Sequence, residues 1–398
     1  MEIRFAESER STLGIEWEIA LVERSSGDLV SVAGDVLAAL AKPDGSPHDR
    51  ITGELLLNTV ELVTGVHHRV KDAVADLQHQ LAEVRAITDP LDVELMCAGS
   101  HPFGQWFEQT VTDKERYHKL IDRTQWWGRN MMIWGIHVHV GIDDREKALP
   151  IVNSLLDYYP HLQALSASSP FWGGVNTGYA SNRALMFQQL PTAGLPYQFG
   201  AWANYEEYVA DLLKTGVISD HTEVRWDVRP SPQWGTVEMR ACDGLSTAEE
   251  IGAVAAFIQC LVDDMSERLD AGEEPPTMQP WFVRENKWRA ARYGMEAEII
   301  LDSSGREELV TDAVRRELER LAPVAARLGC TAELEQVNLI LEHGASYQRQ
   351  LRVAEQNGGS LRAVVASLTK ELRHGLRADV PGVVGADAPT TAQEDFVI

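Results

Sequence analysis

The sequence predicts an α+β fold in which a curved, mainly antiparallel sheet is backed by helices and followed by a helical C-terminal region. Strict alternation of apolar and polar side chains predicts three strands, within residues 13 to 21, 133 to 143 and 236 to 243. Apolar residues at helical spacing predict long helices at residues 69 to 88 and after residue 246. The strands would form the sheet, and the helices would pack against it.

The first strand, LGIEWEIAL at residues 13 to 21, places Glu16 and Glu18 on one face and Ile15, Trp17 and Ile19 on the other. Carboxylates at positions i and i+2 of one strand face repel each other unless a neighbouring strand brings positive charge. A divalent cation would supply that charge.

Between this strand and the first long helix, residues 23 to 31 predict a hairpin turn, and residues 51 to 65 become strand-like towards their β-branched end. Glu54 and Glu61 stand among apolar neighbours in the second segment. Buried carboxylates are rare without a partner or a metal. Both are therefore candidate ligands, although the sequence equally allows Glu54 to be a surface residue.

The two remaining strands repeat the design of the first. IWGIHVHVGID sets His137 and His139 side by side on one face, and TVEMRACD sets Glu238 and Arg240 on one face. Any one such strand is most simply an amphipathic strand with a solvated polar side. The recurrence on three strands favours one sheet face lined with metal ligands, and a set dominated by carboxylates suits Mg²⁺ or Mn²⁺ better than zinc.

Two further segments carry candidate anion-binding residues. The loop at residues 166 to 184 is dense in Gly, Ser and Asn, contains Arg183, and is either a lid or a surface excursion anchored by aromatic side chains. The segment RENKWRAARYG, residues 284 to 294, gathers Lys287, Arg289 and Arg292. These cations either form a solvated basic helix face or hold phosphates or a substrate carboxylate.

The other elements follow from periodicity and turn residues. Helices are predicted near residues 113 to 129, 144 to 168 and 204 to 215, and Ser246 and Glu249 have the spacing of a capping box. Residues 307 to 375 predict two to four helices. Residues 379 to 398 are rich in small residues and proline, which predicts a flexible tail after a single domain at residues 1 to 378.

Composition excludes several partner classes. The chain of 398 residues has a formal charge of −24, which argues against nucleic acid and anionic membranes as partners because both require attraction to phosphate. The cysteines lie far apart without the spacing of a disulfide framework or a zinc site. The N-terminus lacks the apolar run of a signal peptide, so we expect a cytoplasmic protein.

Five motifs, in this order, resemble those of the carboxylate-amine ligases of the type 2 glutamate-cysteine ligase family: GIEWE, VELVT, GIHVHVGI, TVEMRACDG and NKWRAARYG. The resemblance extends from about residue 11 to 375, and that family is related in fold to the catalytic domain of glutamine synthetase. It implies that ATP phosphorylates a carboxylate, such as that of glutamate, and that an amine, such as that of cysteine, displaces phosphate to form an amide. It also implies Mg²⁺ or Mn²⁺ around the phosphates.

The resemblance assigns roles residue by residue. The metal ligands that it implies are Glu16, Glu18, Glu61, His137 and Glu238, with Glu54 as a less direct match. Arg240 would meet the substrate carboxylate or the transferring phosphoryl group, and Arg183 is the second catalytic candidate. The expected nucleotide-binding residues are His139, Lys287, Arg289 and Arg292. Trp17 departs from the pattern, because many relatives carry a third acid there.

Two other functions fit the same ligand face. One is a metal-dependent hydrolase of an amide or phosphoester, and the other is a non-catalytic protein of this fold that binds metal or nucleotide. The sequence does not name the amine acceptor, and it leaves the oligomeric state open, a homo-oligomer included.

Overall fold

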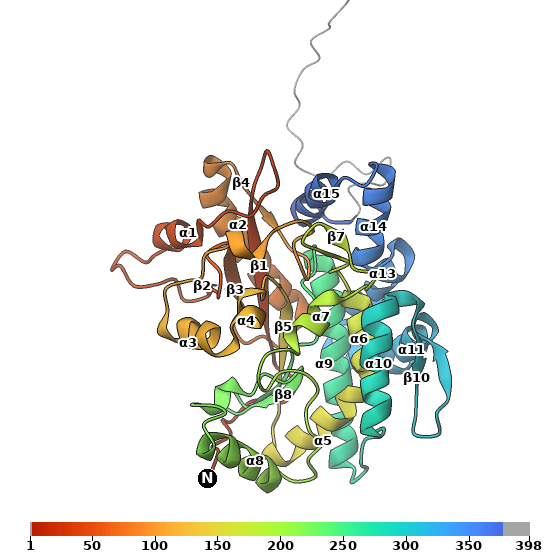
Figure 1. Ribbon diagram of the computed structural model, residues 1–398. Helices are drawn as coiled ribbons and strands as arrows, with labels where there is room; N and C mark the ends of the chain where they lie inside the picture. The colour runs from red at the N-terminus through yellow and green to blue at the C-terminus, as the bar shows by residue number, and fades with distance from the viewer. Residues whose placement is uncertain (1, 377–398) are drawn as a thin grey trace, which may run out of the picture.

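A seven-stranded antiparallel sheet forms the centre of the computed structural model, which describes residues 2 to 376 (Figure 1). The strands lie in the order β2 (Ile51–Gly53), β3 (Thr59–Val63), β1 (Leu13–Glu23), β5 (Ile136–Gly141), β9 (Thr236–Met239) and β8 (Val228–Ser231), and β4 (Val93–Met96) also pairs with β1. Every strand pair in the sheet is antiparallel. The predicted fold class, an antiparallel sheet backed by helices, is confirmed.

The apolar face of the sheet is covered by helices α2 (Val70–Thr88), α5 (Arg145–Leu155) and α9 (Ala248–Asp270). Ile15, Trp17 and Ile19 of β1 are almost completely buried in the hydrophobic core that these helices share with the sheet. Burial of such large side chains is the main favourable term in folding. It fixes which face of β1 points inward, and therefore which face presents Glu16 and Glu18 to the opposite side.

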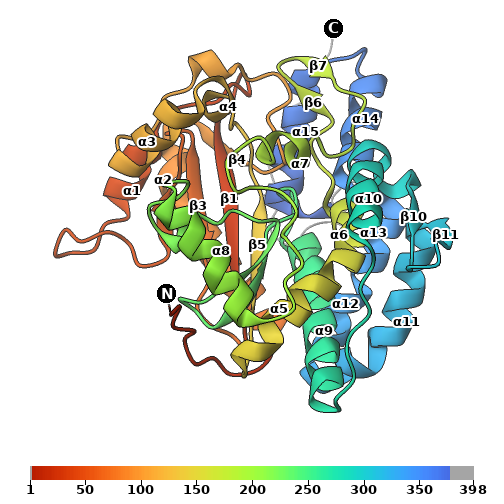
Figure 2. The ribbon, with the colours of Figure 1, turned by 60° about the horizontal axis from the view of Figure 1, so that its bottom comes forward.

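Further helices pack against α9, extend the same hydrophobic core and continue to the C-terminal region. They are α6 (Tyr159–Ser166), α10 (Pro280–Tyr293), α11 (Val310–Leu328), α12 (Thr331–Glu335), α13 (Val337–His343), α14 (Ser346–Gln356) and α15 (Leu361–His374). Figures 1 and 2 show α6, α10 and α11 on the side of α9 away from β3, whereas α15 packs against β4 and the end of β1. A small sheet of β10 (Glu298–Ile300) and β11 (Glu307–Leu309) precedes α11.

The remaining elements lie around the polar face or at the edges of the sheet. The helices are α1 (Ala33–Ala39), α3 (Glu115–Thr124), α4 (Trp126–Arg129), α7 (Asn182–Phe187) and α8 (Trp202–Lys214). The short hairpin is β6 (Phe171–Trp172) with β7 (Val175–Asn176). The 3₁₀ turns of this group are η1 (Asp89–Leu91), η2 (Trp106–Glu108) and η4 (His221–Glu223), whereas η3 (Leu156–Tyr158) and η5 (Gly294–Glu296) lie among the helices that pack against α9.

Several predicted helices are divided in the structure. The segment from 113 to 129 is split into α3 and α4 by Gln125, whose φ of 50° lies in the left-handed region and cannot continue a helix. The segment from 144 to 168 becomes α5, η3 and α6. The region from 307 to 375 begins with β11 and holds five helices rather than two to four, because left-handed residues such as Gly329 end a helix early.

Two further predictions concern the C-terminal tail and the helices of the described chain. The predicted tail at residues 379 to 398 lies outside the described residues. Between residues 2 and 376, no helix combines the length and the apolar character needed to span a lipid bilayer.

Candidate active site

The polar face of the sheet gathers side chains from β1, β3, β5 and β9 in one row. Three pairs of directly opposite residues form it: Glu16 with His137, Glu18 with Glu61, and His139 with Glu238. Directly opposite residues on antiparallel strands share a face and lie within contact distance. The three alternating strands of the sequence therefore do converge on one surface.

One group on this face, which we call the His137 cluster, consists of Glu16, His137 and Glu238. One ligand atom of each lies within 4.8 Å of the others. His137 Nδ1 is 2.7 Å from Glu16 Oε2. Glu238, at 1% exposure, accepts a hydrogen bond of 2.7 Å from Arg229 Nε and another from Arg240.

Positive charge surrounds the carboxylates of the His137 cluster. Burial opposes ionisation of Glu238, but Arg229 and Arg240 outweigh it and hold the pKa of Glu238 well below its usual range. Burial likewise opposes ionisation of Glu16, and hydrogen bonds with His137 and His139 lower the pKa of Glu16 nonetheless. Burial, assisted by the charge of Arg240, lowers the pKa of His137 to about 4. The cluster thus holds ionised carboxylates beside a neutral imidazole, which is the protonation state of metal ligands.

The second group, which we call the Glu61 cluster, consists of Glu18, Glu54 and Glu61. Their carboxylate oxygens also lie within 4.8 Å of one another. Thr52 Oγ1 donates to Glu61 Oε2 at 3.1 Å, and the Gly135 amide donates to Glu18. Glu54 follows β2 in a loop, where it meets the hydroxyl of Tyr117 from α3 at 3.4 Å.

Burial and repulsion between carboxylates raise the pKa values of the Glu61 cluster. Burial and the charge of Glu54 raise the pKa of Glu18 to about 7. Burial, together with the charges of Glu54, Glu16 and Glu18, raises the pKa of Glu61 well above its usual range. Unlike Glu16 and Glu238, none of these three carboxylates forms an ion pair with a side chain of residues 2 to 376. Three half-buried carboxylates that repel one another and have no ion-pair partner among the described residues fit a hard divalent cation.

Two arginines complete the polar face. Arg183 is buried and Arg240 is half-buried, and the Nε atom of each lacks a hydrogen-bond partner among the described residues. Both guanidinium groups lie 5.9 Å from the centre of the Phe187 ring. Arg183 approaches β5 at Gly135, where a Cβ atom would stand 2.1 Å from its guanidinium, so only glycine allows this contact. Guanidinium groups with unused donors are suited to bind an anion.

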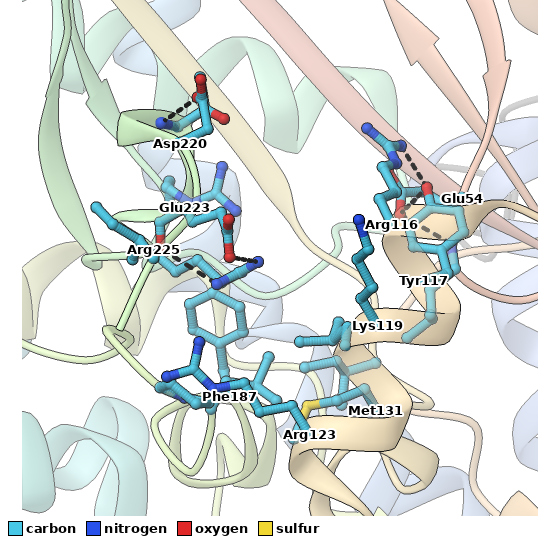
Figure 3. Close-up of a pocket in the computed structure, with 18 of the residues that line it drawn as sticks. Glu54, Arg116, Tyr117, Lys119, Arg123, Met131, Phe187, Asp220, Glu223 and Arg225 are labelled. Carbon is cyan, nitrogen blue, oxygen red and sulfur yellow. Dashed lines mark hydrogen bonds and ion pairs between the residues drawn. The ribbon is translucent and has the colours of Figure 1, made fainter. Parts of the chain in front are cut away.

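These groups open into a cavity of about 860 Å³. Figure 3 shows its two sides: Arg116, Tyr117 and Lys119 point inward from α3, and Glu223 and Arg225 face them from the segment at residues 216 to 225. The floor holds all of the Glu61 cluster together with Glu16, His137, Arg183 and Arg240. A cavity of this size is large enough for a nucleotide together with an amino acid.

The comparison with known protein families agrees with this arrangement. The model of the glutamate-cysteine ligase family 2 matches residues 12 to 367. The chain belongs to this family. Two relatives carry the name "Putative glutamate--cysteine ligase 2": that of Leifsonia xyli subsp. xyli is 68% identical over 374 residues, covering 94% of this chain and 99% of the relative. That of Mycobacterium bovis is 56% identical over 370 residues, covering 93% and 97%.

Two solved structures share the fold of this family member. The glutamate-cysteine ligase of Francisella tularensis, solved in complex with AMP, superposes with a TM-score of 0.65 at 14% identity, covering 93% of this chain and 90% of that one. A bifunctional glutathione synthetase from Pasteurella multocida also gives 0.65, at 16% identity, covering 91% of this chain and 52% of that one. At these identities the likeness concerns the fold.

Nine of the residues expected from the family resemblance meet on the polar face. Seven line the cavity: Glu16, Glu18, Glu54, Glu61, His137, Arg183 and Arg240. Glu238 and His139 are buried on the same sheet face and do not line the cavity. His139 Nδ1 bonds Thr236 Oγ1 at 2.9 Å, and His139 Nε2 is 3.3 Å from Glu16 Oε1. His139 therefore supports the cluster from below and does not face the cavity.

The basic residues of α10 do not line this cavity, so their expected role in nucleotide binding stays a prediction. Lys287 is buried in an ion pair of 2.6 Å with Asp227. Arg289 pairs with Glu285 and Glu307, and Arg292 donates to the carbonyl oxygen of Gly178. Each of these cations therefore already has an acceptor within the protein.

The loop expected to act as a lid is fastened elsewhere. Asp243 accepts hydrogen bonds from the Ser168 amide at 3.0 Å, from Ser169 Oγ at 2.7 Å and from Ser181 Oγ at 2.8 Å. No residue from 166 to 182 lines the cavity. The mouth is bordered instead by α3 and by residues 216 to 225.

Sequence reasoning missed two arginines of the family site. Arg229 lies opposite Glu238 and pairs with it, and Arg225 lines the cavity. A signal was available, because the segment EVRWDVRP alternates Arg225, Asp227 and Arg229 with apolar residues as the other strands do. The same alternation rule therefore predicts that Arg225 and Arg229 share a strand face.

Proposed function

We propose that this protein is an ATP-dependent carboxylate-amine ligase that joins the side-chain carboxylate of glutamate to the amine of cysteine, forming γ-glutamylcysteine through an acyl phosphate. Membership of the glutamate-cysteine ligase family 2 supports the reaction class. The observation that carries the proposal is that two carboxylate clusters converge on one cavity floor with Arg183 and Arg240, whose Nε atoms have no hydrogen-bond partner among the described residues.

The two clusters would hold Mg²⁺ or Mn²⁺. The Glu61 cluster offers three carboxylates without an ion-pair partner among the described residues, and the His137 cluster offers two carboxylates and one imidazole already fixed in position. A bound divalent ion supplies positive charge that stabilises the phosphates of ATP during phosphoryl transfer.

Arg183 and Arg240 would bind the negative groups of the substrates. A guanidinium group offers a planar pair of donors that can hold a carboxylate or a phosphate at two points. A hydrogen bond of 3.4 Å from the Arg183 guanidinium to the Arg240 carbonyl oxygen ties α7 to the residue that follows β9. The nucleophile and the phosphoryl group would thus be positioned by residues that need little rearrangement.

Water must be kept from the acyl phosphate until the amine arrives. The cavity floor consists of buried side chains, and its mouth lies between α3 and residues 216 to 225. Substrates that fill this mouth would exclude water from the floor. The mechanism uses no covalent intermediate with the enzyme, and the four cysteines of the chain are buried thiols.

We also propose that the whole chain up to about residue 378 acts as a single ligase domain, and that it works in the cytoplasm. Free buried thiols are typical of a reducing compartment.

The direct test is product formation by the purified full chain with Mg²⁺, ATP, glutamate and cysteine. We expect ADP and γ-glutamylcysteine in equal amounts, with the product identified by mass. Glu18→Gln, which keeps the size of the side chain, is the matched inactive control. Absence of ADP with every carboxylate and amine tested would exclude ligase activity, and turnover of an amide or phosphoester without ATP would support the hydrolase alternative.

A further inference from the structure

A second cavity, of about 190 Å³, lies among the helices that pack against α9 and shares no lining residue with the candidate active site. Its walls come from η3, α6, α11, residues 276 to 278 and the turn that follows β10. Asp157 and His161 both line it. They are four residues apart, about one helical turn, which places their side chains on the same side of the chain.

His161 has unused hydrogen-bonding groups. Its side chain is buried at 3% exposure, and neither ring nitrogen has a hydrogen-bond partner of ordinary geometry among residues 2 to 376. The Tyr158 carbonyl, one turn earlier, comes near the ring and could serve at most one of the two nitrogens. Burial, assisted by the charge of Arg316, lowers the pKa of His161 to about 3, so the ring is neutral and one nitrogen remains an acceptor.

Asp157 carries the unpaired charge of this cavity. Its carboxylate accepts a hydrogen bond of 3.0 Å from the Met278 amide and has no ion-pair partner in the described part of the chain. Burial raises the pKa of Asp157 to about 7. The other charged residues around the cavity already have partners: Asp302 with Arg306 at 3.2 Å, Glu317 with Arg320 at 2.7 Å, and Arg316 with Glu308.

We propose that this cavity binds a small molecule through a primary ammonium group, held by the carboxylate of Asp157 and a ring nitrogen of His161. An ammonium group brings three donors, no acceptor and one positive charge, which matches an unpaired carboxylate beside an acceptor nitrogen. A bare metal ion fits less well, because the ligand atoms of three or more residues do not converge here as they do in the active site.

The size and the outer wall of the cavity limit the source of the ammonium group. A volume of about 190 Å³ admits a short amine or a free amino acid. Arg306 and Arg316 also line the cavity and keep free guanidinium donors, so an amino acid could place its carboxylate beside them. The shared chemistry is the ammonium group, and the two sources can be separated by experiment.

The test uses three matched probes on the full chain, measured by calorimetric titration. L-alanine has both charged groups, ethylamine has the ammonium group alone, and propionate has the carboxylate alone. We expect saturable binding of L-alanine and none of propionate. Binding of ethylamine at similar affinity would assign the site to amines in general, and weaker binding of ethylamine would assign it to free amino acids.

Variants locate the binding. Asp157→Asn and His161→Leu should each weaken binding at least about tenfold, because each removes one charge-assisted or acceptor contact. Arg183→Met, in the other cavity, should leave it unchanged, and unfolding by urea checks that each variant is folded. The proposal is overturned if no probe binds saturably, if propionate binds as well as L-alanine, or if binding survives both cavity variants and is lost in Arg183→Met. The outcome does not depend on ligase activity.

Discussion

The His137 cluster and the Glu61 cluster occupy one sheet face, and both contain glutamates, yet they differ in charge balance. In the His137 cluster, Arg229 and Arg240 hold Glu238 in its ionised form. In the Glu61 cluster no carboxylate has an ion-pair partner among residues 2 to 376. Burial, followed by repulsion from neighbouring glutamates, raises the pKa of every member although Arg116, Arg183 and Arg240 oppose the shift. Arginine side chains balance the negative charge of the first cluster, whereas the carboxylates of the second cluster have no ion-pair partner among the described residues.

This difference indicates separate tasks for the two clusters. Ion pairs and hydrogen bonds fix the His137 cluster in position before anything binds, which is the condition for a preorganised ligand set. The Glu61 cluster instead stores unfavourable electrostatic energy that a divalent ion would relieve. We therefore expect metal binding to change the stability of the protein mainly through the Glu61 cluster.

The largest expected effect is on catalysis. Glu18→Gln and Glu61→Gln remove a ligand charge while keeping the side-chain volume, and we expect turnover to fall by about 1000-fold, since a metal contributes several kcal/mol to charge stabilisation. Steady-state formation of ADP measures it. Arg292→Met is the control, because Arg292 lies on α10 outside the cavity and its loss should leave turnover at the wild-type level. Equal losses in the control and the two variants would contradict the separation of α10 from the site.

The next effect concerns the stability of the metal-free protein. Glu238→Gln leaves Arg229 and Arg240 half-buried without their shared counter-charge, so we expect the free energy of unfolding to fall by about 3 kcal/mol. Urea unfolding in the presence of a chelator measures it. An unchanged midpoint would mean that the arginines do not depend on Glu238 as the 2.7 Å contact with Arg229 indicates.

The matched change in the other cluster should have the opposite sign. Glu61→Gln removes one of three repelling carboxylates, and we expect the metal-free protein to gain about 1 kcal/mol in its free energy of unfolding. The same urea experiment compares it with Glu238→Gln. Destabilisation by both variants would remove the distinction between the clusters.

The smallest effect concerns Tyr117. Its hydroxyl contacts Glu54, the one member of the Glu61 cluster that lies in a loop rather than a strand. We expect Tyr117→Phe to weaken Mg²⁺ activation by about tenfold, which is the lower end of the loss found when a partner of a metal ligand is removed. The concentration of Mg²⁺ that gives half-maximal turnover reports it, whereas a change in the maximal rate alone would point to another role.

The sequence predicts the strand faces of the site well because of a simple geometric rule. Side chains alternate along a strand with a period of two, so Glu16, Glu18, His137 and Glu238 had to share faces with polar neighbours once the apolar residues were buried. Which of these side chains lie opposite one another depends on the strand register, which is set by pairing between distant segments of the chain. Glu54 illustrates the limit, because its loop position could not be read from alternation.

Charge alone predicts a binding site poorly. The segment from 284 to 294 is basic in a strongly acidic chain, yet Lys287 is paired with Asp227, which lies 60 residues away in the sequence. No local pattern reveals such a partner. Arg229 shows the reverse case, since its role follows from its pairing with Glu238 across β8 and β9 rather than from a cluster of positive residues.

The sequence predicts the helix after β9 correctly but places its N-cap one residue too early. The helix after β9 is capped by Thr247, which accepts from the Glu250 amide at 3.1 Å, one residue later than the spacing of Ser246 and Glu249 predicts. Ser246 donates instead to the buried carboxylate of Glu371 in α15. A tertiary contact therefore decided between two cap residues that the sequence could not distinguish.

The most direct measurement is a titration of the chelator-treated protein with Mn²⁺, followed by electron paramagnetic resonance without nucleotide. If the Glu61 cluster is a cation site, the wild type should bind Mn²⁺ saturably. Glu61→Gln should bind fewer Mn²⁺ ions per chain, because only the His137 cluster remains, and Arg292→Met should bind as many as the wild type. Equal Mn²⁺ binding by the wild type and Glu61→Gln would contradict the assignment.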